Sequence, residues 1–82
     1  MTNNTSAAPI GIIYSGGPAD GILDAVPSTN VATRLGKGDT AVYYRSSGKP
    51  KHDKNGLERL EYIYVGPEAP TDIPVVSAGD HV

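Results

Sequence analysis

The sequence predicts a small all-β domain, a barrel or sandwich of about four to six short strands. Ten glycines and seven prolines among 82 residues exceed the ordinary share of about 12% for the two together, which indicates many turns and few long helices. Two segments rich in β-branched and aromatic residues, 39–45 and 59–65, have the composition of strands. A length of 82 residues allows one domain, near the lower end of what folds unaided.

The chain is expected to begin with a flexible arm, because residues 1–9 are small and polar. Residues 10–14 are apolar and lie between a proline and the glycine pair at 16–17, which favours a short strand. A second short apolar stretch, GILDAV, ends at Pro27. The folded β domain is expected over residues 10–66.

The stretch IGIIYSGGPADG, residues 10–21, resembles two catalytic segments. One belongs to class I glutamine amidotransferases and implies a cysteine nucleophile, which this chain lacks. The other is the pyrophosphate loop of N-type ATP pyrophosphatases, which needs an acidic residue two places after the second glycine and then a hydroxyl residue. Here Asp20 stands one place late and Gly21 follows it. We therefore interpret the stretch as a strand that ends in a β-turn, with Pro18 and a positive-φ glycine.

The segment PSTNVATRLGKGD, residues 27–39, is compatible with one or two helical turns. Ser28 or Thr29 could serve as the N-cap and Gly36 as the stop. A loop fits nearly as well, because Thr, Asn and Val are poor helix formers.

Segments 39–45 and 59–65 are expected to pair as an antiparallel hairpin, because both have a strand composition, the first begins after the turn residues GKGD and the second alternates between two faces. Side chains two residues apart share one face of such a strand. The side chains expected to face the core are Val42, Tyr44, Leu60 and Tyr62.

A long basic loop, residues 46–58, is expected between these two strands, because 13 residues exceed the 2–5 of a tight hairpin connection. From Arg45 to Arg59 the chain has five basic residues and two acids, a balance of +3. The other residues have two basic residues and seven acids, a balance of −5. The sequence therefore describes a mildly acidic body with one basic segment.

The last segment, residues 67–82, is punctuated by Pro67, Pro70 and Pro74. Because proline cannot donate a hydrogen bond to a sheet, we expect this extended segment to form an edge strand or a docking arm.

The interior is expected to be thin, because the chain has no Phe, Trp or Cys and five Tyr must supply the large side chains. Without cysteine, disulfides and thiolate metal sites are excluded, and His52 and His81 are too few for a zinc site. No cofactor is expected. Association with other chains is the remaining support for so small a domain, so the expected partners are further copies of this chain or other protein subunits.

We predict that the protein is not an enzyme but a structural or adaptor protein that self-associates or docks in a larger assembly. Virion decoration, tail and connector subunits offer an analogy only. Ser46 or Ser47, His52 and Asp53 could form a triad on paper, but neighbours on a loop give no rigid geometry. The expected location is the cytoplasm or a virion and not a membrane, because no apolar run approaches about 20 residues and the polar start is no signal peptide.

The alternative is a small nucleic-acid-binding or inhibitory module that uses the basic segment 45–59. Cations would contact phosphates and tyrosines would stack on bases. The net charge of −2 opposes this hypothesis. The candidate binding residues are Arg45, Lys49, Lys51, Lys54, Arg59, Tyr43 and Tyr62.

Overall fold

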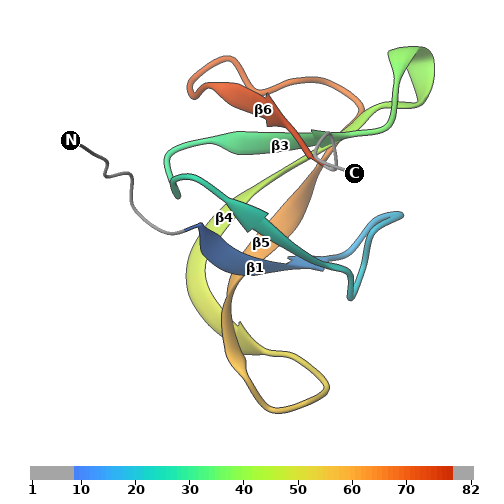
Figure 1. The fold of residues 1–82 in the computed structure, drawn as a ribbon. Coiled ribbons are helices and arrows are strands. Elements are labelled where there is room, and N and C mark those ends of the chain that lie inside the picture. Colours follow the sequence, from blue (N-terminus) through green and yellow to red (C-terminus); the bar gives the residue numbers. More distant parts are fainter. Residues whose placement is uncertain (1–8, 79–82) are drawn as a thin grey trace, which may run out of the picture.

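The predicted all-β fold is confirmed by the computed structural model, which describes residues 9–78 (Figure 1). Its six strands form one sheet that curls into a half-barrel. The expected N-terminal arm, apart from Pro9, and residues 79–82 lie outside the described residues. The strands are β1 Ile10–Ser15, β2 Leu23–Val26, β3 Ala32–Leu35, β4 Val42–His52, β5 Glu58–Gly66 and β6 Val75–Ser77.

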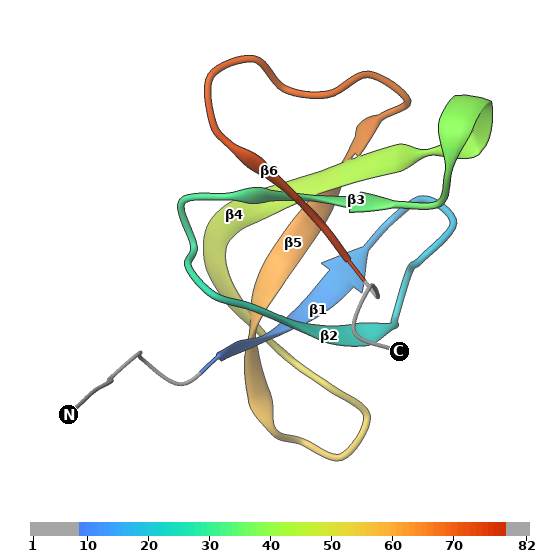
Figure 2. The same ribbon diagram turned by 45° about the horizontal axis from the view of Figure 1, so that its top comes forward.

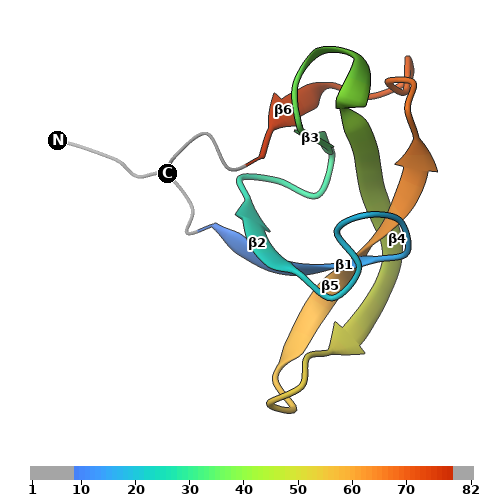
Figure 3. The same cartoon turned by 90° about the vertical axis from the view of Figure 1, so that its right-hand side faces the viewer.

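The strand order across the sheet is β2-β1-β5-β4-β3-β6. Strand β1 pairs in parallel with β5, and β3 pairs in parallel with β6, while the other three pairs are antiparallel. Figure 3 shows β4 and β5 as the long curved wall, with β2 and β6 on the opposite side, and Figure 2 shows β1 beside β5. The sheet therefore ends in two short edge strands, β2 and β6.

The strand expected at residues 10–14 is confirmed as β1, and the GILDAV stretch supplies β2. The Tyr14 amide donates to the Ile22 carbonyl at 3.0 Å, so the amide of Tyr14 points toward β2. By the alternation of an antiparallel ladder, the Ala25 amide points away from β1, toward the open edge. That amide donates to the Asp24 carboxylate at 2.8 Å, so a side chain occupies this edge donor.

The helical turns considered for residues 27–39 are wrong over most of that segment, because Ala32–Leu35 form strand β3. Thr33, a β-branched residue, is buried and lies opposite Tyr44 of β4. Packing against the sheet thus favours the extended backbone over a weak helix propensity. Only Gly38–Thr40 form a single 3-10 turn.

The antiparallel hairpin is confirmed, but the long loop 46–58 is wrong. Strand β4 continues to His52, and the connection to β5 is a tight turn over residues 53–57. Between Ser46 and Pro50 strand β4 advances four residues while β5 advances two, from Tyr62 to Leu60, so a bulge absorbs the difference. The Ser46 and Ser47 hydroxyls accept the amides of Gly48 and Lys49, and Gly48 has a φ of 80°. Turn-forming residues here shape a bulge inside a strand.

Three tyrosine rings, Tyr14, Tyr44 and Tyr62, fill the interior. The ring centroids of Tyr14 and Tyr44 lie 4.6 Å apart, and those of Tyr14 and Tyr62 lie 6.4 Å apart at an interplanar angle of 84°. The expected inward direction of Tyr44 and Tyr62 is confirmed, and Val42 and Leu60 pack against this cluster. The core cluster consists of Ile12, Tyr14, Ala19, Val26, Tyr44 and Tyr62.

Each of these three hydroxyls holds a different part of the chain. The Tyr14 hydroxyl donates to Asp24 of β2 at 2.7 Å, and the Tyr62 hydroxyl donates to the Val31 carbonyl at 2.8 Å. The Tyr44 hydroxyl donates to the Gly16 carbonyl at 2.7 Å and accepts the Ala19 amide at 2.9 Å. Burial raises the pKa of Tyr14 far above its ordinary value, and the Asp24 carboxylate adds to that shift. Tyrosine therefore has an advantage over phenylalanine here, because its ring fills the core and its hydroxyl forms a hydrogen bond with a neighbouring connection or strand.

The segment 67–78 follows β5 and returns across the sheet to β6. The Ala32 amide donates to the Pro74 carbonyl, and the Ala78 amide donates to the Arg34 carbonyl, both at 2.8 Å. Val75–Ser77 therefore form an edge strand on β3.

We predict that Tyr44→Phe lowers the free energy of unfolding by about 1–3 kcal/mol, because the buried Ala19 amide loses its acceptor while the ring still fills the core. Tyr43→Phe is the matched control, since Tyr43 is half-buried and outside the core cluster. Urea denaturation of the two variants checks this, and an equal loss from both would contradict it.

Candidate binding surface

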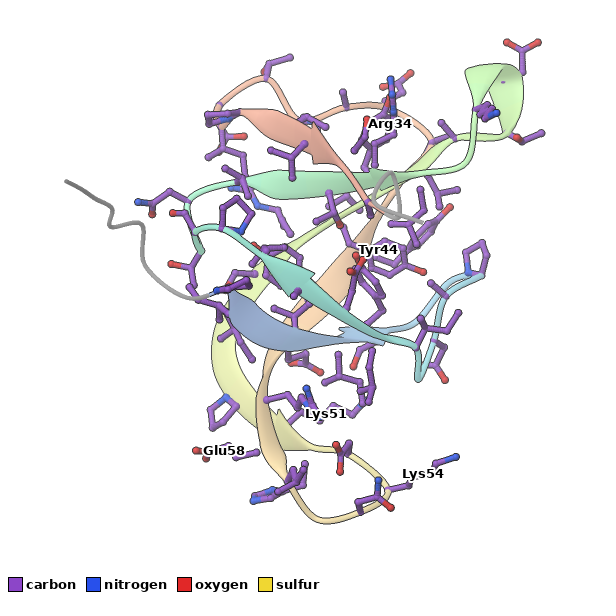
Figure 4. The ribbon with its side chains drawn as sticks, in the orientation of Figure 1. Arg34, Tyr44, Lys51, Lys54 and Glu58 are labelled. Atoms are coloured by element: carbon purple, nitrogen blue, oxygen red, sulfur yellow. The ribbon has the colours of Figure 1, made fainter. Side chains whose placement is uncertain are left out.

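The structure distributes the seven candidate binding residues over β4, β5 and the turn between them. Figure 4 shows Lys51, Lys54 and Glu58 toward the β4–β5 hairpin end, Arg34 near the opposite end, and Tyr44 between them. The basic segment is therefore a strand pair and not a loop, and its side chains meet partners from other strands.

Tyr62 is wrong as a candidate binding residue, because its side chain is 0% exposed and its hydroxyl is bonded to Val31. Burial raises the pKa of Tyr62. Tyr43 is half-buried on β4. The stacking surface proposed for these two rings is thus reduced to Tyr43 alone.

Arg45 is paired with Asp72, a residue of the segment between β5 and β6. The guanidinium makes a two-pronged contact with the carboxylate, at 3.2 Å and 2.9 Å. Hydrogen bonds from Arg45 lower the pKa of Asp72. A cation that is neutralised in this geometry offers little charge to a phosphate.

Arg59 is paired with Asp53, whose carboxylate organises the β4–β5 turn. The Asp53 carboxylate accepts the Asn55 amide at 2.8 Å, the Leu57 amide at 3.0 Å and the Arg59 Nε at 3.1 Å. Burial alone would raise the pKa of Asp53, but these three donors outweigh burial and hold the pKa below its ordinary value of 3.8. Asp53 and Arg59 therefore stabilise the turn.

A polar cluster on the outward side of the sheet holds Lys51. The Lys51 ammonium donates to the Ser15 hydroxyl at 2.6 Å. Hydrogen bonds from the Ser15 and Ser47 hydroxyls lower the pKa of Glu61, and the charges of Lys51 and Lys49 lower it further. A serine beside a lysine can act as a nucleophile, but here Ser15 bridges a lysine and a carboxylate across β1, β4 and β5. The arrangement is that of a cross-strand ionic network.

The local charge differs from what the sequence segment suggests. Two acids from outside the segment, Glu61 and Asp72, join Asp53 and Glu58. The five cations of the segment therefore face four acids, a local balance of +1 in place of +3. Lys49 and Lys54 are exposed.

The serines and the aspartate considered for a triad have structural roles. The Ser46 and Ser47 hydroxyls cap the bulge, and the Asp53 carboxylate is engaged in the turn. His52 is an exposed residue at the end of β4. Among residues 9–78 no group of three or more His, Asp or Glu could hold a metal ion.

The glycine-rich stretch after β1 is the β1–β2 connection, which confirms its interpretation as a turn. The Gly16 amide donates to the Asp20 carboxylate at 2.7 Å, and the Gly21 amide donates to the Tyr14 carbonyl at 2.8 Å. The Ala19 amide donates to Tyr44, so three amides of this connection that could have held a phosphate already have partners within the protein. Gly17 has a φ of 64°, and a Cβ there would lie 2.5 Å from the Tyr64 ring.

The outward-facing apolar residues of β5 were not among the predicted binding residues. Ile63 and Val65 are each 40% exposed, on the face opposite the buried Tyr62. The signal was present in the alternation RLEYIYV, where the outward positions change from charged to apolar along the strand.

A groove of about 510 Å³ lies beside Val65, between the end of β5 and the segment that follows it. The Arg45–Asp72 pair forms part of its wall. It is lined by Arg45, Val65, Gly66, Pro67, Glu68, Ala69, Pro70, Thr71 and Asp72.

Comparison of the chain with protein-family models, with curated proteins and with solved structures finds no match. Within the part of the chain that the structure describes, no helix is long and apolar enough to cross a membrane.

We predict that Gly17→Ala destabilises the protein more than Gly21→Ala. Both glycines have positive φ, but a Cβ at Gly17 would also overlap Tyr64 and Tyr44, whereas at Gly21 no atom lies within 4 Å. Strain alone costs about 1 kcal/mol, and the overlap at Gly17 adds to it. Thermal or urea unfolding of both variants checks this order. Equal stabilities would contradict a close contact of Gly17 with the rings of Tyr64 and Tyr44.

We predict that the stability difference between the wild type and Asp53→Asn is largest near neutral pH and shrinks as the pH falls below about 4. A lowered pKa in the folded state means that the charged carboxylate stabilises the fold above its ordinary pKa of 3.8 and that this contribution is lost on acidification. Urea denaturation between neutral pH and pH about 2.5 measures the difference.

Asp39→Asn is the control for this experiment, since it removes the same charge from an exposed residue outside the β4–β5 turn. A difference for Asp53→Asn that stays constant with pH would contradict the assigned role of the carboxylate.

Proposed function

We propose that this protein is a non-enzymatic structural or adaptor subunit that self-associates or docks in a larger assembly. The observation that carries the proposal is the amount of apolar surface left open on so small a domain. Among residues 9–78, seven large apolar side chains are 37–58% exposed. They are Ile22, Leu23, Leu57, Ile63, Tyr64, Val65 and Val75.

The small interior supports the same proposal. Its largest fully buried side chains are three tyrosines, one isoleucine, one valine and one threonine. A domain below about 80 residues rarely gains more than about 3–5 kcal/mol from such a core. Binding of a partner to the folded state adds stability that grows with the logarithm of the ratio of partner concentration to Kd. Burial of the exposed apolar residues against a partner would thus add stabilisation that the small core does not provide.

The roles of the polar residues support a protein without catalysis. Ser15, Asp53 and the serines of the bulge each hold a turn, a bulge or a neighbouring strand. Amides of the glycine-rich connection are likewise engaged within the protein. Groups with such structural partners are poorly disposed to act on a substrate.

Nucleic-acid binding is less well supported than protein association. In its favour, Lys49 and Lys54 are exposed. Against it, Arg45 and Arg59 are both paired with aspartates, and Tyr62 is buried. Affinity for nucleic acid comes largely from cations that neutralise phosphates and so release the counterions of the nucleic acid. An arginine that is already paired with an aspartate contributes little to this.

We predict that the molar mass in solution exceeds the 8.5 kDa of one chain and rises with protein concentration. The melting temperature should rise with concentration as well, because association stabilises the folded state. Size-exclusion chromatography with light scattering and thermal unfolding, each over a hundredfold range of concentration, test this. A monomer whose mass and melting temperature do not change with concentration would contradict self-association, and binding of labelled oligonucleotides by that monomer would favour the alternative.

A further inference from the structure

The outer face of β5 is unusual for a central strand. In a sheet with one face on the core, outward positions are expected to be polar. Arg59 and Glu61 follow this rule, whereas Ile63 and Val65 are apolar and each 40% exposed. Strand β5 lies between β1 and β4, so this apolar ridge, Ile63 and Val65, is in the middle of the sheet and not at its edge.

The ridge has a groove beside it on the same side of the molecule. Val65 belongs to both, and Pro67, Ala69 and Pro70 give the groove an apolar lining. A two-fold interface uses the same patch on both copies, and a two-fold rotation can place the ridge of one copy against the groove of the other.

The charges around the ridge fit a second copy better than a charged partner. Ile63 lies opposite Arg45 on β4 and beside Ser15 on β1. Arg45 and Asp72 form an ion pair on one flank, and the charges of Lys49 and Lys51 act on Glu61 on the other. With Glu68 of the groove, these three cations and three acids sum to zero. Two-fold symmetry brings each patch against its own charges, so a patch of no net charge avoids repulsion.

The edges of the sheet are less suited to pairing between copies. The outward Ala25 amide of β2 is occupied by the Asp24 carboxylate, and Pro27 follows directly. Strand β6 has three residues and is preceded by Pro74. Short strands, proline and occupied edge donors are the means by which proteins prevent edge-to-edge pairing.

We propose that a second copy of this chain docks on the outer face of β5, with Ile63 and Val65 of each copy against the groove of the other about a two-fold axis. This inference rests on the proposed function and assigns its surface and its partner. An interface built on one ridge and one groove belongs with those that bury less than about 1,200 Å² in total and dissociate readily. The dimer is therefore weak and forms with rising concentration.

The first test compares Ile63→Lys with Leu57→Lys by sedimentation velocity over a range of protein concentrations. Leu57 is the matched control, because it is 58% exposed but lies in the β4–β5 turn. We expect Ile63→Lys to raise the dimer Kd at least tenfold, since a charged side chain would have to lie against the apolar lining of the other copy's groove, and Leu57→Lys to leave the Kd unchanged. Circular dichroism and urea denaturation establish that both variants are folded.

The second test does not depend on Ile63→Lys being folded. Because the chain has no cysteine, a single introduced cysteine reports on its own surroundings. Under mild oxidation, Val65→Cys should form disulfide-linked dimers faster than Leu57→Cys or Val75→Cys, because only Val65 lies near the proposed axis.

The outcomes separate this inference from the proposed function. If the wild type associates but Ile63→Lys associates equally well, or if Val75→Cys links faster than Val65→Cys, the assigned surface is overturned while self-association stands. If the wild type remains a monomer at every concentration, this inference and the self-association part of the proposed function are both overturned, and the outer face of β5 has no second copy as its partner.

Discussion

The fold depends on three tyrosine hydroxyls that reach from the core to the connections around it. Tyr14, Tyr44 and Tyr62 come from three adjacent strands, and their rings contact one another inside the half-barrel. Their hydroxyls bind β2, the β1–β2 connection and the residue before β3. These hydrogen bonds matter in a one-layer sheet. Among the described residues no second sheet or α-helix packs against the connections to hold them in position.

The sequence predicted the elements that local composition determines. The strand at residues 10–14 and the two inward tyrosines of the hairpin followed from alternation and from bounding glycine and proline. The helical turns at 27–39 and the loop at 46–58 were wrong for a shared reason, since each was judged from propensity alone. Thr33 and Pro50 belong to strands because a neighbouring strand is there to pair with them, and such pairing is not visible in a single segment.

The candidate surface was predictable only in part for a similar reason. The five cations of the basic segment were evident, but the acids that oppose them, Glu61 and Asp72, stand outside the segment and meet it only in the folded sheet. The outward apolar positions of β5 follow from alternation, since Ile63 and Val65 share a face with Arg59 and Glu61. Whether these two side chains form a binding surface depends on how exposed each one is in the folded protein, and strand propensity does not predict that.

The tyrosine core also makes the molecule its own optical reporter. With no tryptophan or phenylalanine in the chain, five phenol rings are its only aromatic chromophores apart from the histidine imidazoles, and three of them are buried in fixed mutual orientations. Near-ultraviolet circular dichroism therefore reports on core packing with no competing indole signal. A state that keeps its strands but loosens this interior would be recognised by the disappearance of that signal alone.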